Sequence, residues 1–250
     1  MFGVCNEGLP KQVNYLIDES HTIGTNGTSS HGPNNVISML HHYFAKHGLG
    51  EKGCILHADN CSGQNKNRSV IGYLAWRCMV GLHEEIQLSF MIAGHTRCLV
   101  DGCFRLIKQK YRRSDCDTLE QLQKVVDDSA TVNVAQLYQE PTSSRPSFKW
   151  YDWVSFLDER FKPIAGIRSL QHFRFSSKFP GDVFVKESGT ATERKITILR
   201  PKHPAIRKSS LPPVIAAAGL TQERKQYLFS TIREHVWDPY KDITCPNPDI

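Results

Sequence analysis

The chain has 250 residues, is 40% hydrophobic and carries a formal net charge of +6. Its length allows one large domain or one domain with a smaller appendage, and its hydrophobic fraction is enough for a packed core. It contains no apolar run near the ~20 residues that span a membrane and no signal-peptide pattern, so we expect an intracellular protein without a membrane partner, the nucleus being one alternative compartment.

The first 50 residues predict a β-hairpin, a loop and a helix. Residues 2–7 and 12–19 read as two strands because apolar side chains alternate with polar ones on either side of a Gly-Pro-containing turn. A loop rich in Gly, Ser, Thr and His follows over residues 20–33. Asn34 or Asn35 is then placed to cap a helix that ends at Gly48.

A short apolar run predicts the central strand of the sheet. Residues 53–58 are almost continuously apolar, which is typical of a strand covered on both faces, and the run ends at Asp59. His57 is expected to lie in the core. A polar turn over residues 60–67 leads into a helix over residues 69–80, whose wide apolar set predicts near-complete burial.

The next elements continue the alternation of strands and helices. Residues 86–92 alternate as a strand that stops at Gly94, and a helix is expected over residues 101–113. Thr118 and Gln121 form a capping box for a further helix. This order predicts an α/β fold in which helices cover a sheet.

The second half predicts an α+β extension. We expect a first domain over residues 1–139, a linker over residues 140–149 and the extension over residues 150–250. Its expected elements are a helix over 153–161, a hairpin of strands 182–186 and 195–199, and a last helix over 221–236.

Three aspartates lie at strand ends or at a helix start along one edge of the predicted sheet. Asp18 and Asp59 end strands, and Asp101 begins a helix. Sites of open α/β sheets form where parallel strands present their carboxyl ends, and hard oxygen ligands there favour Mg²⁺ or Mn²⁺. The alternative for each aspartate is a helix cap or a turn residue.

The loop after Asp59 is unusually rich in amides, hydroxyls and cations. Such a loop can bind phosphate or orient a metal-bound water, whereas a structural turn needs only one of these groups. The candidate residues for binding phosphate or nucleic acid in this loop are Asn60, Ser62, Gln64, Asn65, Lys66, Asn67 and Arg68.

His95 is a candidate proton shuttle beside Asp101. The alternative is that His95 only hydrogen-bonds its own turn. A third possibility is a metal site that uses His95, Cys98 and Cys103, although none of the eight cysteines forms the CxxC pair of a zinc ribbon.

Five cations without an acid among them follow Asp101. Either they form a solvated helix face or they hold a nucleic-acid backbone. The members of this basic stretch are Arg105, Lys108, Lys110, Arg112 and Arg113.

Several motifs occur together from residue 2 to the C-terminal helix. They are FGVCNE, QVNYLIDE, HADNCSGQNKNR, YLAWR, GHT followed by Asp101 and FRLIK, and LTQERKQYLF. Their combination resembles a eukaryotic domain family of unknown function that is spread largely by transposable elements. That family looks RNase H-like, the fold shared by DDE/D transposases, integrases and related nucleases. The resemblance implies a mixed sheet flanked by helices and a metal-dependent reaction on nucleic acid.

The resemblance also implies roles for two aspartates. Asp59 would be the acid on the fourth strand and Asp101 the acid from the last helix. Relatives carry an acid-bearing strand upstream, so we expect this chain to lack the first strand of the fold, which would place Asp18 on the third strand. Between Thr96 and Asp101 the chain reads RCLV, where relatives have a smaller turn that contains Gly and Pro.

Two functions are therefore expected. The first is a transposon-derived domain that cleaves or transfers nucleic-acid strands, with DNA as the expected partner and Mg²⁺ or Mn²⁺ as cofactor. The alternative is a truncated, catalytically inactive remnant that binds nucleic acid or protein.

Overall fold

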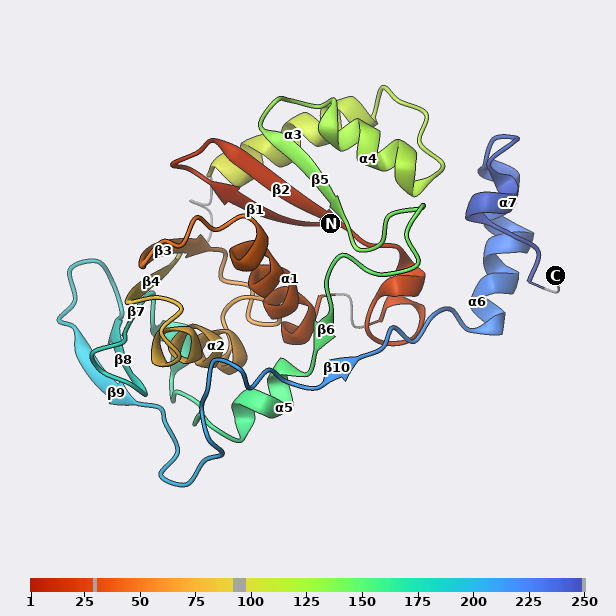
Figure 1. Cartoon of the computed structure of the whole chain (residues 1–250). Helices are drawn as coiled ribbons and strands as arrows, with labels where there is room; N and C mark the ends of the chain where they lie inside the picture. The colour runs from red at the N-terminus through yellow and green to blue at the C-terminus, as the bar shows by residue number, and fades with distance from the viewer. Residues whose placement is uncertain (29–30, 92–97, 249–250) are drawn as a thin grey trace. The chain divides into compact units, whose positions relative to one another are not determined.

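The chain folds into two compact units, each built from separate stretches of sequence (Figure 1). The computed structural model describes residues 1–28, 31–91 and 98–248. We predicted consecutive parts over 1–139, 140–149 and 150–250, whereas each unit combines stretches that alternate along the chain. One passage of the chain from unit 1 to unit 2 follows Lys149. Unit 1 comprises Met1–Ser30, Arg97–Lys149 and Ala216–Ile250, and unit 2 comprises His31–Thr96 and Trp150–Ile215.

Unit 1 is centred on a three-stranded sheet. Strand β1 (Phe2–Asn6) pairs antiparallel with β2 (Lys11–Leu16), which confirms the predicted hairpin. Strand β5 (Asn133–Leu137) pairs with β2 in parallel and was not predicted. The sheet order is therefore β1-β2-β5.

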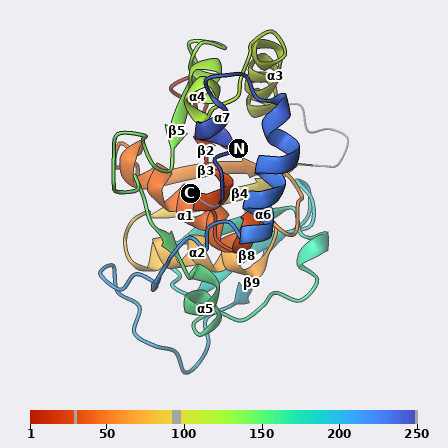
Figure 2. The same cartoon turned by 90° about the vertical axis from the view of Figure 1, so that its right-hand side faces the viewer.

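Helices α3 (Leu99–Tyr111) and α4 (Leu119–Asp127) pack with this sheet (Figure 1 and Figure 2). The predicted capping box is confirmed, since the Thr118 hydroxyl accepts a hydrogen bond from the Gln121 amide at 3.2 Å. The small core of the unit contains Leu16, Ile107, Val126 and Leu137. Phe104 of α3 lies so close to Gly3 of β1 that a Cβ there would meet its ring at 2.6 Å, which explains the glycine.

The C-terminal segment of unit 1 is helical but not one regular helix. Helix α6 (Gln222–Tyr227) continues into a π-helical turn (Leu228–Ile232) and a 3-10 turn (Arg233–His235), followed by α7 (Lys241–Thr244). The predicted single helix over 221–236 is therefore confirmed only at its start. Arg224 holds the segment to the turn after β2 by donating to both carboxylate oxygens of Glu19 at 2.9 Å.

Unit 2 is built on a five-stranded mixed sheet in the order β3-β4-β7-β8-β9. The pair β3 and β4 is parallel, and the other neighbours are antiparallel. Strands β8 and β9 form the predicted hairpin, whereas β7 was not predicted. Their bounds are β3 (Gly53–Ala58), β4 (Glu85–Phe90), β7 (His172–Ser176), β8 (Asp182–Lys186) and β9 (Arg194–Thr197).

Three α-helices lie in the described part of unit 2. Helix α2 (Arg68–Met79) is buried at ten of its 12 positions, which confirms the predicted burial. Helix α1 (Pro33–Lys46) begins after Gly32, so the predicted cap at Asn34 or Asn35 is wrong. Asn34 instead accepts a hydrogen bond from the Val154 amide at 2.8 Å and thereby ties α1 to α5 (Trp153–Asp158). Two short strands, β6 (Trp150–Tyr151) and β10 (Val214–Ile215), pair antiparallel.

The predicted double-sided burial of β3 is wrong. Among the residues that the structure describes, this strand lies at an edge of its sheet and has β4 as its only strand partner. Leu56 packs against the core, whereas the alternating side chains of Ile55 and His57 face away from it, and Ile55 is 68% exposed. An apolar residue on the open face made the run look continuous.

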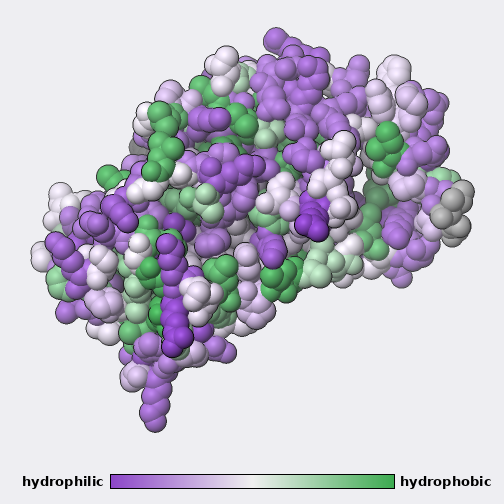
Figure 3. Space-filling model, in the orientation of Figure 1, coloured by the Kyte–Doolittle hydropathy of each residue, from purple (hydrophilic) through white to green (hydrophobic). Residues whose placement is uncertain are grey.

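The fold class is mixed α/β, as predicted. No helix within the described ranges is both long and apolar enough to cross a membrane. Mainly hydrophilic residues cover the part of the surface over α3 and α4 that Figure 3 displays.

Candidate functional site

Asp59 closes the turn that follows β3. Its Oδ1 accepts hydrogen bonds from the Cys61 amide at 3.0 Å and from Asn65 Nδ2 at 2.9 Å. Its side chain is exposed, and no donor among the described residues contacts Oδ2. The turn role that we expected as the alternative is therefore present, and within the described ranges Oδ2 of Asp59 has no hydrogen-bond partner.

Lys66 and Asn60 join the ends of β3 and β4 inside unit 2. The Lys66 ammonium donates to Asn60 Oδ1 at 2.9 Å and to the Arg168 carbonyl at 3.0 Å, and Lys66 is only 4% exposed. Burial lowers its pKa. Asn60 in turn donates to the carbonyl of Met91. These contacts hold both side chains within the unit and fix the loop that carries Asp59.

The remaining candidates in this loop have different surroundings. Asn67 caps α2, because its Oδ1 accepts from the Ser69 and Val70 amides at 3.0 Å. Arg68 forms an ion pair with Asp158. Ser62 is exposed, and the side chain of Gln64 is half-buried.

The other predicted carboxylates lie in unit 1, and both act in helix-start turns. Asp18 Oδ1 accepts from the amide and hydroxyl of Ser20 at 2.8 and 2.6 Å. Asp101 Oδ2 accepts from the Cys98 amide at 3.4 Å and completes the start of α3. His95 lies outside the described residues. Across residues 1–28, 31–91 and 98–248 no three His, Cys, Asp or Glu side chains group as metal ligands.

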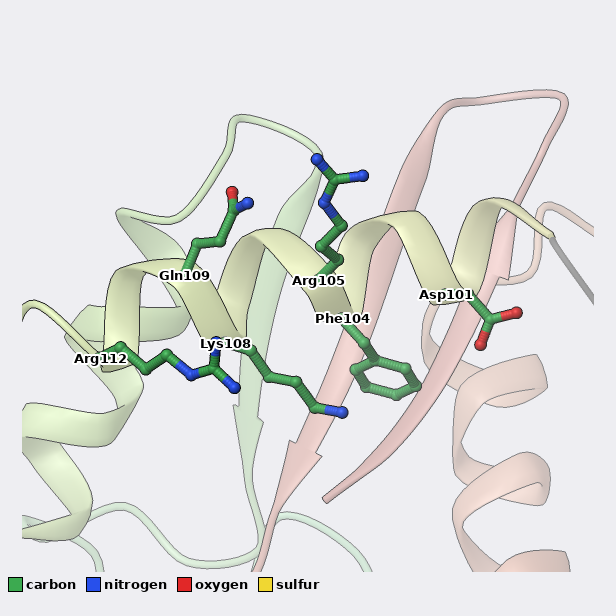
Figure 4. A pocket seen from close by; sticks show the side chains of 6 residues that line it. All are labelled: Asp101, Phe104, Arg105, Lys108, Gln109 and Arg112. Carbon is green, nitrogen blue, oxygen red and sulfur yellow. The ribbon is translucent and has the colours of Figure 1, made fainter.

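One face of α3 is basic and exposed. Arg105, Lys108 and Arg112 recur at helical spacing and line an open pocket together with Asp101, Phe104 and Gln109 (Figure 4). The three cations are exposed, and in the described part of the chain none of them forms an ion pair. Arg113 is exposed just beyond the helix. The buried side of α3 carries Cys103 and Ile107, so packing turns the basic face outward.

The sheet of unit 2 has an open face whose polar residues were not predicted as a site. Its strand β7 brings His172 beside Ser89, where the serine Oγ lies 2.8 Å from His172 Nδ1. Since these residues are 83 positions apart, no local sequence pattern indicated their pairing.

Comparisons with known proteins place the chain in a family. No curated protein and no solved structure matches it. A family model matches residues 15–193, which is more than half of the chain and includes strands of both units. The chain belongs to the family described as a domain of unknown function (DUF7869).

Proposed function

We propose that this chain binds nucleic acid and that the basic face of α3 holds the phosphate backbone. The observation that carries this proposal is the row of exposed, unpaired cations Arg105, Lys108 and Arg112 on one side of a helix. Contacts of Lys and Arg with phosphates release counterions and supply most of the sequence-independent affinity for DNA. The helix is stable without these side chains, because its other face anchors it to the core.

Alanine at Arg105, Lys108 or Arg112 is expected to weaken DNA binding several-fold and to reduce the salt dependence by about one phosphate contact each. The measurement is fluorescence anisotropy of a labelled DNA duplex at several KCl concentrations. Lys124→Ala is the matched control, because Lys124 is also a helical cation of unit 1 but is paired with Asp128 at 2.8 Å. An unchanged salt slope in all three variants would rule out α3 as the contact surface.

We further propose that the bound strand is cleaved or transferred in a reaction that depends on Mg²⁺ or Mn²⁺. Oδ2 of Asp59, which no donor in the described part of the chain contacts, supports this, since Mg²⁺ in phosphoryl-transfer sites is held by one or two carboxylates together with substrate phosphates and water. Asp101 and Asp18 are the other candidate ligands, with His95 as a candidate proton carrier. Such an ion supplies charge stabilisation at a scissile phosphate and a more acidic bound water.

Asp59→Asn is expected to abolish cleavage of single- or double-stranded DNA in Mg²⁺ or Mn²⁺. Asparagine keeps an oxygen that accepts from Cys61 and Asn65 but removes the charge, so the loop keeps its fold. Asp59→Ala, which loses both, is the comparison, and gel analysis of end-labelled DNA gives the rate. Cleavage at an unchanged rate in both variants would contradict the metal role. Binding without cleavage by the unaltered chain corresponds to the alternative, a non-catalytic binding remnant.

A further inference from the structure

Four polar side chains form a row across the open face of the unit 2 sheet. The strand register pairs His57 with Ser89, Ser89 with His172, and His172 with Lys186. Directly paired residues point to the same face of a sheet and have Cβ atoms about 5 Å apart. The residues of four strands, β3, β4, β7 and β8, are thus brought side by side. We call this set the polar row.

The face that carries the polar row is the one that does not pack against the core. On the other face the alternating neighbours are Leu88, Phe173 and Val185, which belong to the hydrophobic core of the unit, and Leu56, which packs against that core. In the polar row itself, His57 is exposed, and the other three side chains are half-buried. The row is therefore held by a rigid sheet.

The polar row offers hydrogen-bond donors and contains no acid. Ser89 Oγ is hydrogen-bonded to His172 Nδ1, which leaves His172 Nε2 to face another group. Lys186 Nζ donates one hydrogen to the Gly189 carbonyl at 2.6 Å and has two more.

The acids near the polar row do not neutralise its donors. Glu193 is close to Lys186, but Arg174 engages both of its carboxylate oxygens. Asp59 follows His57 by two positions. The pKa of His172 is lowered by burial and, to a smaller degree, by the neighbouring Lys186 and His57.

Phosphate oxygens match this donor set. An ammonium, imidazole N–H groups and a hydroxyl are the side-chain donors that form charge-assisted hydrogen bonds with phosphate. We propose that the polar row binds a phosphate group of a nucleic-acid strand beside Asp59. This inference rests on the proposed function and adds to it a second contact, on unit 2, for the backbone of the strand.

The test follows the imidazole NMR signals of the full chain during pH titrations in a buffer without phosphate. The ligands are a single-stranded thymidine 12-mer and, separately, inorganic phosphate. The oligonucleotide is expected to raise the pKa of His172, because a bound phosphate stabilises its protonated form. The signals of His203, an exposed histidine of the same unit that lies outside the row, are expected not to respond to either ligand.

His172→Gln and Ser89→Ala are expected to weaken binding of the oligonucleotide by about tenfold, the effect of one charge-assisted hydrogen bond. His203→Gln is the matched control and should bind like the unaltered chain. The inference is overturned if His172→Gln binds normally and neither ligand moves the titration of His172.

The outcomes separate this inference from the proposed function. If the α3 variants lose DNA binding while the oligonucleotide leaves the His172 signals unchanged, the proposed function stands and the polar row has no part in it. A response of His172 to inorganic phosphate but not to the oligonucleotide marks a site for free phosphate and overturns the assignment to nucleic acid. An unaltered chain to which the oligonucleotide does not bind, by anisotropy or by NMR, overturns both.

Discussion

Trp153→Ala is expected to lower the free energy of unfolding of unit 2 by about 3 to 5 kcal/mol, the cost of removing a large aromatic side chain from a core. Trp153 is 0% exposed, and its ring centroid lies 5.0 Å from that of Tyr73 and 5.3 Å from that of Trp76. Truncation would leave a cavity that helices α2 and α5 cannot close without losing these contacts. Urea denaturation followed by circular dichroism measures the loss.

Trp153→Phe is the control for this substitution. The indole Nε1 of Trp153 is buried without a hydrogen-bond partner in the described structure, so phenylalanine gives up no polar contact and should cost much less than alanine. The experiment also tests the interleaved arrangement, because α5 comes from residues beyond 150 and α2 from residues before 80. A loss below about 1 kcal/mol for the alanine variant would show that α5 is not part of the core.

Acidification is expected to destabilise unit 2 through buried neutral histidines. The pKa of His83 is lowered from 6.5 to about 4, first by burial and then by Arg77 and Lys52, while Glu51 opposes the shift. The pKa of His41 is lowered to about 4 by burial, Arg77 and His42. His83 is 4% exposed, and its Nδ1 accepts from Arg77 Nε at 3.2 Å, a contact that only the neutral ring can make.

Between the folded and the unfolded pKa of such a histidine, the unfolded chain binds more protons than the folded chain. A fall in pH therefore favours the unfolded chain. The stabilisation is complete above pH 6.5 and is lost as the pH falls from 6.5 to about 4. For His83 alone the loss is about 3.5 kcal/mol, because its pKa falls from 6.5 to about 4 and one pKa unit corresponds to about 1.4 kcal/mol.

Urea denaturation at a series of pH values tests this expectation. Fluorescence in a Trp237→Phe background reports on unit 2, because the other three tryptophans, Trp76, Trp150 and Trp153, belong to that unit. His83→Gln keeps an acceptor for Arg77 but does not titrate, so its stability should depend less on pH. His203→Gln should retain the full dependence. A pH dependence that is the same in both variants would contradict the role of His83.

Local signals in the sequence predicted local structure well. The apolar run at Gly53–Ala58 gave the bounds of β3, and the polar pair at Thr118 and Gln121 gave the start of α4. Both depend on residues within one or two turns of chain. The basic face of α3 could likewise be predicted from the sequence. Cations at helical spacing lie on one side of a helix, whatever that helix packs against.

Long-range pairing could not be predicted in the same way. Strand β5 pairs with β2 and strand β7 pairs with β4, and each of these partners lies far away in sequence, so no local pattern shows which strand either one meets. The continuous apolar run made β3 look central and placed His57 in the core, whereas the side chain of His57 is exposed. The polar row depends on the register of four strands and is invisible without them.

For Asp59 the sequence predicted the local structure but not the partners. The sequence predicted that this residue ends a strand and begins a polar turn, and the hydrogen bonds to Cys61 and Asn65 agree with that. Any partnership with Asp101 depends on how two separate units act together, which no run of residues encodes. The metal role therefore stays a prediction for the cleavage assay.

The position of β7, far after β4 in the sequence, has a consequence for synthesis on the ribosome. Strand β4 ends at Phe90 and its neighbour β7 begins at His172, so about 80 residues must be made before that edge of β4 is paired. At typical translation rates this takes on the order of several seconds. During that time the nascent chain displays an unpaired strand edge beside unfilled apolar surface, the kind of template that promotes aggregation. Nascent chains arrested before residue 172 should therefore depend on chaperones far more than the finished protein does.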